Sequence, residues 1–252
     1  MRLFLPPVKA RLVWIPIILT ALLVSACQPV ELPELAIPGT PTTPTTPDHA
    51  GETPDASAQG YQLPSPDLIG TQTLEEVMAR RRSIRSYTDQ PLSMEQIGQL
   101  LWSAQGITDA AGRRTAPSAG ALYPLEMYVA TAQGVFHYDP QQHSLSLHLQ
   151  GDLRPELHAA SLHQDSVLEG AAVFIFSAVY ERTEQRYGAE RTPRYVYMEV
   201  GHAAQNLLLQ AVALDLGAVP IGAFFEDQVS TILSLPEDHQ PVYIIPVGYP
   251  DL

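Results

Sequence analysis

The stretch from Arg194 to Leu216 restricts the possible folds of this chain more than any other. Its apolar side chains recur at helical spacing and on nearly every side, which leaves little room for a polar face: Val196, Val200, Ala203, Ala204, Leu207, Leu208, Ala211, Val212 and Leu214. A helix of this kind is buried on more than one side, and in a domain of this size we predict that it lies at a subunit interface. We expect its polar residues to be satisfied by neighbouring backbone, the usual state of buried polar groups: Glu199, His202, Gln205 and Asn206.

Short apolar segments elsewhere predict a sheet. Leu125–Thr131, Val135–Tyr138 and Ser144–Leu149 are separated by turn residues, and we expect them to form an antiparallel meander. Residues 171–179 are apolar throughout, which indicates an inner strand covered on both faces. Residues 242–249 add a closing strand.

Helix signals surround these strands. Thr73–Arg82 has a cap residue and acidic residues in its first turn, and Ser93-Met-Glu-Gln96 is a capping-box pattern. Asp152–Ala160 and Asp227–Leu235 predict two further short helices. The fold class is therefore α+β.

Four arginines and two serines fall within eight residues, Arg80-Arg-Arg-Ser-Ile-Arg-Ser-Tyr87, of a chain whose formal net charge is −13. Like charges this close repel one another, so the cluster favours a bound anion. Guanidinium groups match phosphate oxygens two at a time, and Ser83 can add a hydroxyl donor. The alternatives are a solvated basic patch, or pairing of the arginines with Glu75 and Glu76 one turn earlier.

Two other segments are small and uncharged at their centres. Ala119, Gly120 and Ala121 lie between two prolines, and Gly217–Phe224 is a turn controlled by glycine and proline. Each leaves room for a flat ligand to approach the main chain. The alternative interpretation of residues 113–124 is a surface loop that ends at a strand.

The first 26 residues predict a secretion signal. A short basic start precedes the apolar run Leu12–Val24, about 13 residues long, whereas a spanning helix needs roughly 20. The run ends in Leu23-Val-Ser-Ala-Cys27, which resembles the lipobox of bacterial lipoproteins and implies lipidation of Cys27. We therefore expect an extracytoplasmic protein anchored to the membrane by lipid; the alternative is an uncleaved membrane anchor.

Residues 27–66 carry the lipidated cysteine and a linker rich in proline and threonine, which cannot bury enough apolar surface to fold. Residues 67–252 form the expected domain. Without the leader, 11 arginines face 27 acidic residues, so the net charge of −16 disfavours nucleic acid. The one lysine, Lys9, lies in the leader, and Cys27 is the one cysteine, so lysine catalysis, disulfides and iron–sulfur clusters are excluded from the domain.

Five motifs together resemble the flavin-dependent nitroreductase superfamily, and within it the SagB-type dehydrogenases, which include the azoline oxidases. They are Arg81-Arg-Ser-Ile-Arg85, Leu100-Leu-Trp-Ser-Ala-Gln-Gly106, Pro117-Ser-Ala-Gly120, Gly201-His-Ala-Ala-Gln-Asn-Leu207 and Pro220-Ile-Gly-Ala223. The resemblance covers about Thr73 to Pro250. It implies a three-layer α+β fold with a mixed, mainly antiparallel sheet, and a homodimer with FMN at its interface.

Carried over position by position, the resemblance assigns three groups of cofactor-binding residues. The FMN phosphate and ribityl chain would be bound by Arg81, Arg82, Ser83 and Arg85. The isoalloxazine would be lined by Pro117, Ser118, Ala119 and Gly120, and its other edge near N5 approached by Pro220, Ile221, Gly222 and Ala223.

Two departures from the family pattern affect function. The azoline oxidases have a Lys-Tyr pair where this chain has Arg194-Tyr195, so Tyr195 is the expected catalytic residue, while Arg194 is a poor base because its pKa lies above about 12. Many nitroreductases also have a basic residue near the C-terminus, whereas this chain ends Gly248-Tyr-Pro-Asp-Leu252. Arg113 or Arg114 would have to replace that phosphate contact.

The sequence thus predicts an FMN-dependent oxidoreductase that transfers hydride through flavin N5 to or from a small organic substrate. No metal site is expected. Two alternatives are an NAD(P)H-dependent nitro or quinone reductase, and a non-catalytic, tethered flavin-binding lipoprotein. The redox partner is left open between a quinone, oxygen and NAD(P)H.

Overall fold

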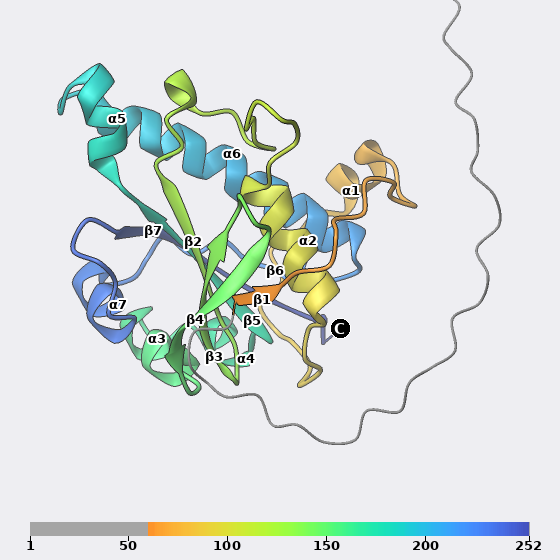
Figure 1. Ribbon diagram of the computed structural model, residues 1–252. Helices are drawn as coiled ribbons and strands as arrows, with labels where there is room; N and C mark the ends of the chain where they lie inside the picture. Colours follow the sequence, from red (N-terminus) through yellow and green to blue (C-terminus); the bar gives the residue numbers. More distant parts are fainter. Residues whose placement is uncertain (1–59, 252) are drawn as a thin grey trace, which may run out of the picture. The chain divides into compact units, whose positions relative to one another are not determined.

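The computed structural model describes residues 60–251, and Figure 1 shows how their helices and strands are arranged. The predicted signal peptide of residues 1–26, the lipidated Cys27 and most of the linker of residues 27–66 lie outside the described residues. Among residues 60–251, no helix is long and apolar enough to cross a membrane.

Seven strands form one sheet in the order β1–β4–β3–β2–β5–β7–β6. Their bounds are β1 Gly60–Gln62, β2 Leu125–Ala130, β3 Gly134–Asp139, β4 Ser144–Gln150, β5 Ala172–Ala178, β6 Gly217–Ala218 and β7 Gln240–Gly248. All neighbouring strands are antiparallel, and the parallel pairing in the described chain is the isolated bridge between Ser83 and Ala218. The predicted meander of β2, β3 and β4 is confirmed, as is the burial of β5.

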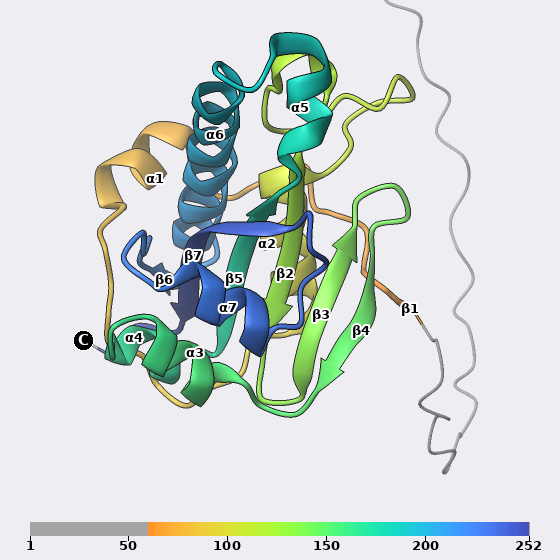
Figure 2. The same cartoon turned by 90° about the vertical axis from the view of Figure 1, so that its left-hand side faces the viewer.

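Helices cover both faces of this sheet, which gives the expected three layers (Figure 2). Successive side chains of β5 point to opposite faces. Phe174 and Phe176 pack with α2 and α6, whereas Val173 and Ile175 pack with α3, α4 and α7. The bounds are α1 Leu74–Arg80, α2 Met94–Gln105, α3 Arg154–Ala160, α4 Asp165–Glu169, α5 Tyr180–Tyr187, α6 Thr192–Ala213 and α7 Glu226–Ile232.

Local sequence signals set the ends of the first two helices. Thr73 and Ser93 form capping boxes with Glu76 and Gln96 at the starts of α1 and α2, and Gly106 ends α2. Each box satisfies N–H groups that have no partner inside the helix. Both helices therefore begin where the sequence predicts.

The structure differs from the expectation at one edge of the sheet. β1 lies within residues 27–66, which we interpreted as a linker: it pairs with β4, Tyr61 packs edge-on against Phe136 at 5.7 Å, and Leu63 is buried. The folded part thus includes residues 60–66, because these side chains find an apolar partner in the meander.

Two helices were not predicted. α4 is a short helix of five residues. α5 has no apolar residue between Tyr180 and Tyr187, so it lacks the stripe by which an amphipathic helix is identified. α6 begins at Thr192, two residues before the predicted start, because Pro193 is tolerated in a first turn.

Gly217 lets the segment after α1 lie directly against β6. Ile84 N donates to Ala218 O at 3.0 Å, beside the bridge between Ser83 and Ala218. A Cβ at position 217 would lie 2.7 Å from Ile84 Cγ2, which is too close for two unbonded carbon atoms. This approach fixes the arginine segment to the strand that leads into Pro220–Ala223.

We expect Gly217→Ala to lower the free energy of unfolding by about 2 kcal/mol, because the added methyl group overpacks the contact with Ile84. Urea unfolding measures the change. Gly70→Ala is the control, since the nearest atom to its added Cβ would be Gln72 O at 3.8 Å. Equal stability of the two variants would contradict the close approach.

Candidate active site

The turn Pro220–Ala223 lies beside the arginine segment, a few residues after the C-terminal end of α6. Ile221 N donates to Ile244 O at 2.8 Å and Ile244 N donates to Ile221 O at 3.1 Å. Ala223 O accepts a hydrogen bond from Gln164 Nε2 at 3.0 Å. The turn is thus held between β7 and the connection from α3 to α4, and its last two residues are exposed.

The acidic neighbours of the arginine segment are already engaged with other partners. Glu76 accepts hydrogen bonds from the backbone and side chain of Thr73. Arg80 pairs with Asp215 at 2.9 Å and also donates to Gln72. The alternative in which the arginines pair with Glu75 and Glu76 is therefore wrong for this fold.

Three guanidinium groups of the segment have no carboxylate partner within residues 60–251: Arg81, Arg82 and Arg85. Arg82 Nη1 donates to the carbonyl oxygens of Ala79 and Arg81 at 3.1 and 2.7 Å, at the end of α1. Three cations close together without a neutralising carboxylate favour an anion such as a phosphate.

The backbone is strained directly after the loop Pro117–Gly120. Gly120, Ala121 and Tyr123 have φ angles of 64°, 54° and 47°. Residues with a Cβ adopt this region at a cost of about 1 kcal/mol or more, and such strain is concentrated at functional sites. A Cβ at position 120 would also lie 3.1 Å from the hydroxyl of Tyr187, so a glycine suits this position for two reasons.

The structure brings two of the three predicted groups together and keeps the third apart. Pro117–Gly120 lie beside Glu199, whereas the turn at Pro220–Ala223 and the arginine segment lie past Ala213, where α6 ends. At 1.5 Å per residue, Glu199 and Ala213 are about 20 Å apart along the axis of α6. One chain therefore does not place both loops around one ring system.

Tyr195, the predicted catalytic residue, lies on the same side as Pro117–Gly120. It is on the first turn of α6, with its ring centroid 4.4 Å from that of Tyr187. Tyr187 in turn borders Gly120. Tyr195 and Glu199 are four residues apart on the helix and so share a face.

The suggested substitutes for a C-terminal basic residue also lie in this half. Arg113 pairs with Asp109, and Arg114 Nη1 donates to Gln105 Oε1 at 2.6 Å. Neither joins the arginine segment within one chain.

Glu199 and Gln105 occupy the centre of this half. We expected neighbouring backbone to satisfy Glu199, and the sequence assigns no role to Gln105. Their side chains are buried, with exposed fractions of 2% and 1%. Glu199 Oε1 and Gln105 Nε2 have no hydrogen-bond partner among the described residues. Burial raises the pKa of Glu199 to about 7, against the opposing effects of Ser118, Arg114 and Gln105. A carboxyl with such a pKa can give or take a proton at neutral pH.

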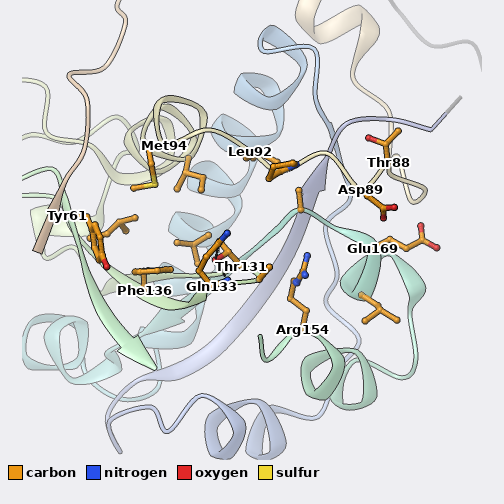
Figure 3. Close-up of a pocket in the computed structure, with 17 residues that line it drawn as sticks. Tyr61, Thr88, Asp89, Leu92, Met94, Thr131, Gln133, Phe136, Arg154 and Glu169 are labelled. Carbon is orange, nitrogen blue, oxygen red and sulfur yellow. Dashed lines mark hydrogen bonds between the residues drawn. The ribbon is translucent and has the colours of Figure 1, made fainter. Parts of the chain in front are cut away.

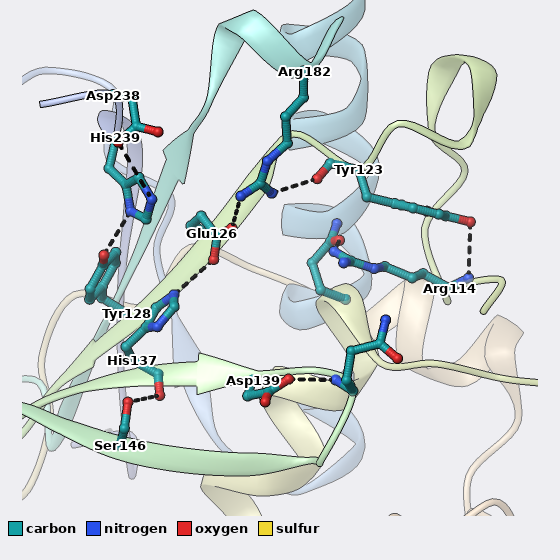
Figure 4. Close-up of polar contacts among 12 residues, drawn as sticks. Arg114, Tyr123, Glu126, Tyr128, His137, Asp139, Ser146, Arg182, Asp238 and His239 are labelled. Carbon is teal, nitrogen blue, oxygen red and sulfur yellow. Dashed lines mark hydrogen bonds and ion pairs between the residues drawn. The ribbon is translucent and has the colours of Figure 1, made fainter. Parts of the chain in front are cut away.

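A second polar network borders this half (Figure 4). Arg182 donates to Tyr123 O and to Glu126 Oε1, and His137 Nε2 lies 2.8 Å from Glu126 Oε2. Burial alone would raise the pKa of Glu126, but its hydrogen bonds with His137 and Arg182 outweigh burial and lower the pKa to about 2. This network anchors β2 to β3 and α5.

The structure also contains a cavity of about 550 Å³ that holds none of the predicted site residues (Figure 3). Tyr61, Met94 and Phe136 lie at one side of the cavity, and Arg154 and Glu169 lie towards the other (Figure 3). The Arg154 guanidinium is occupied by Asp152 and by Gly170 O. Across residues 60–251, no three histidine, cysteine or acidic side chains gather as a metal site would require.

Comparison with known proteins identifies close relatives. The model of the nitroreductase family matches residues 78–249. A protein of Methanocaldococcus jannaschii named as a nitroreductase is 42% identical over 193 residues, which is 74% of this chain and 94% of the relative. An FMN reductase (NADPH) of Bacillus subtilis is 26% identical over 69% of this chain and 65% of the relative. The crystal structure of a protein from Ralstonia eutropha, also named as a nitroreductase, has a TM-score of 0.69 at 30% identity and covers 77% of this chain and 90% of the other.

We expect Glu126→Gln to lower the free energy of unfolding by about 2 kcal/mol near neutral pH, because Arg182 and His137 lose their carboxylate. The pKa of Glu126 is depressed in the folded state, so this stabilisation is present above the ordinary glutamate pKa of 4.5 and is lost as pH falls towards about 2. The difference between variant and wild type in urea unfolding should therefore shrink in acid. Glu181→Gln, an exposed change on α5, is the control. A difference that stays constant with pH would show that the carboxylate charge is not what stabilises the network.

Proposed function

Because the chain belongs to the nitroreductase family of oxidoreductases, we propose that it is an FMN-dependent enzyme that transfers hydride through flavin N5 to or from a small organic substrate. The observation that carries the proposal is the arginine segment, in which Arg81, Arg82 and Arg85 have no carboxylate partner within residues 60–251. The close approach at Gly217 holds that segment beside a turn with exposed Gly222 and Ala223.

The residues present fit the chemical parts of FMN. The arginine segment with Ser83 would hold the phosphate and ribityl chain, and the two small-residue loops, Pro117–Gly120 and Pro220–Ala223, would lie against the isoalloxazine. When bound, FMN supplies the hydride chemistry, while the protein supplies position and electrostatics. Tyr195 would hold a proton at its hydroxyl oxygen near the Pro117–Gly120 loop, where its ring stacks on Tyr187.

A homodimer would complete this site. The two halves are about 20 Å apart along α6 in one chain, so a second copy would have to supply the loop that the first cannot bring near. A groove of about 770 Å³ runs along α2 and α6, between the segment before α1 and the end of α6. Leu68 and Ile69 on its rim are 74% and 83% exposed. Tyr197 and Met198 on α6 are each more than half exposed. Such apolar surface supports an interface between copies.

The SagB-type branch is the finer assignment that we propose within the family. It is supported by the order of the motifs along the chain, including Gly201-His-Ala-Ala-Gln-Asn-Leu207. Arg194 does not favour azoline oxidation, because an arginine is a poor base. The same residues also suit a nitro or quinone reductase that uses NAD(P)H, and the similarity to an FMN reductase (NADPH) favours that candidate.

We also propose that the protein is an extracytoplasmic lipoprotein anchored through Cys27. The lipobox-like sequence at the end of an apolar run of about 13 residues supports this localisation. A membrane quinone or oxygen would then be a suitable redox partner, because nicotinamide nucleotides are scarce outside the cytoplasm.

If the arginine segment binds phosphate, Arg85→Ala should weaken FMN about 10- to 100-fold and leave riboflavin binding almost unchanged, because a charge-assisted contact to phosphate is lost. Quenching of flavin fluorescence on titration measures both affinities. Arg80→Ala is the matched control from the same segment, since its guanidinium pairs with Asp215. Equal weakening of FMN and riboflavin by Arg85→Ala would contradict the phosphate site.

The bound flavin should be reduced by a physiological donor. Anaerobic bleaching of the flavin spectrum with NADH, NADPH and a reduced quinone distinguishes the candidates. Fast bleaching by a nicotinamide donor identifies an NAD(P)H-dependent reductase, and selective bleaching by the quinol identifies a membrane partner. If no donor reduces the flavin and no acceptor reoxidises it, the protein is a flavin-binding lipoprotein and not an enzyme.

A further inference from the structure

Two buried polar atoms point to a function for the interior beneath the Pro117–Gly120 loop. Glu199 Oε1 and Gln105 Nε2 are an acceptor and a donor that have no hydrogen-bond partner among residues 60–251. Both side chains are more than nine-tenths buried, and Ser118 of the loop lowers the pKa of the Glu199 carboxyl. A buried polar atom without a partner destabilises the fold, so its presence calls for a cause outside simple packing.

Among residues 60–251, no ion pair fixes Glu199. Arg114 is the one cation that acts on it, and the Arg114 guanidinium donates to Gln105 Oε1 and lies over the ring of Tyr123, 4.5 Å from its centroid. Two charges in turn affect the pKa of Arg114: Glu126 on β2 raises it and Arg182 on α5 lowers it. The polar groups that lower the pKa of Glu199 are Ser118 from the loop and Gln105 from α2.

Burial is the largest influence on this carboxyl, and it raises the pKa to about 7. At neutral pH the protonated and ionised forms are therefore both populated. General acid–base catalysis is most efficient when the pKa of the proton donor lies near the working pH.

Ser118 connects this carboxyl to the loop. Ser118 Oγ accepts a hydrogen bond from Tyr123 N at 2.9 Å, so its own hydroxyl proton is available for donation. An oxygen that receives a proton on one side and releases its own on the other can pass protons along. The loop geometry thus gives Glu199 a route to whatever lies against Pro117–Gly120.

We propose that Glu199 is the proton carrier of the redox site, holding one proton on its carboxyl group and passing it through the Ser118 hydroxyl to the molecule bound against the Pro117–Gly120 loop. This inference rests on the proposed function. A hydride brings two electrons and one proton to an acceptor, and a second proton completes the reduction. Glu199 supplies that proton, becomes a carboxylate and is reprotonated from solvent; for oxidation of a substrate, each transfer runs in reverse.

The first test needs no cofactor. Potentiometric titration of the flavin-free protein should show one titrating proton fewer around pH 7 in Glu199→Gln than in wild type. Glu184→Gln, which removes an exposed carboxyl on α5, should titrate around pH 7 as wild type does. A wild-type curve from Glu199→Gln would overturn the proposal, because Glu199 would then carry no exchangeable proton at neutral pH.

The second test uses the flavin-loaded protein with the best donor and acceptor pair. We expect Glu199→Gln to lower kcat about 100-fold, to change KM little and to remove the pH dependence near 7. FMN affinity, and its loss in Arg85→Ala, should be unaffected by Glu199→Gln. An unchanged kcat and pH profile would overturn the role of Glu199 as proton carrier and leave the proposed function intact. If the wild type does not bind FMN, the proposed function itself is overturned.

Ser118→Ala keeps the test decisive if Glu199→Gln does not fold. It should retain the proton that titrates near pH 7 in the flavin-free protein and still lower kcat, because the carboxyl is intact but the relay is broken. Full kcat in Ser118→Ala would overturn the route through this hydroxyl.

Discussion

The packing of α6 against the sheet is the constraint on which the rest of the structure depends. Its buried side chains, among them Val200, Ala203 and Leu207, join the core with α2 and with one face of β5. Because α6 is a long helix of 22 residues, its two ends are far apart. One end carries Tyr195 and Glu199 beside the strained loop, and the other leads through β6 to the turn at Pro220. The length of a single helix thus sets the spacing between the two halves of the proposed site.

The sequence predicted the elements whose cause is local. The cap residue Thr73 and the capping-box pattern at Ser93 predicted two helix starts, and continuous apolar character identified β5 as buried on both faces. Motif resemblance also indicated the family. α5 was not predicted because it has no apolar stripe. β1 was not predicted because its three residues are stabilised by pairing with β4, which a local sequence pattern does not indicate.

The site was predictable in its parts and not in its arrangement. The arginine segment and the turn were recognisable as motifs, but their contact depends on the missing Cβ of Gly217, a tertiary effect. Glu199 was interpreted as one of several polar residues satisfied by backbone. Its lack of a partner results from how Gln105 and Arg114 pack around it: Arg114 takes the carbonyl oxygen of the Gln105 amide, and the amide nitrogen is left without a partner. Periodicity along α6 contains no information about that competition.

Two separate costs to stability meet in the same small region. Ala121 and Tyr123 have backbone angles that disfavour a residue with a Cβ, and Glu199 Oε1 is buried without a hydrogen-bond partner among residues 60–251. A single cost of this kind can be an accident of packing, since native proteins tolerate a few. When both occur within one loop and the helix beneath it, the structure around them must supply compensating stability, here the core shared by α2, α6 and the sheet. A bound molecule that relieves the strain and pairs with the carboxyl would recover part of that cost, so affinity for ligand and the instability of the empty loop would share one physical origin.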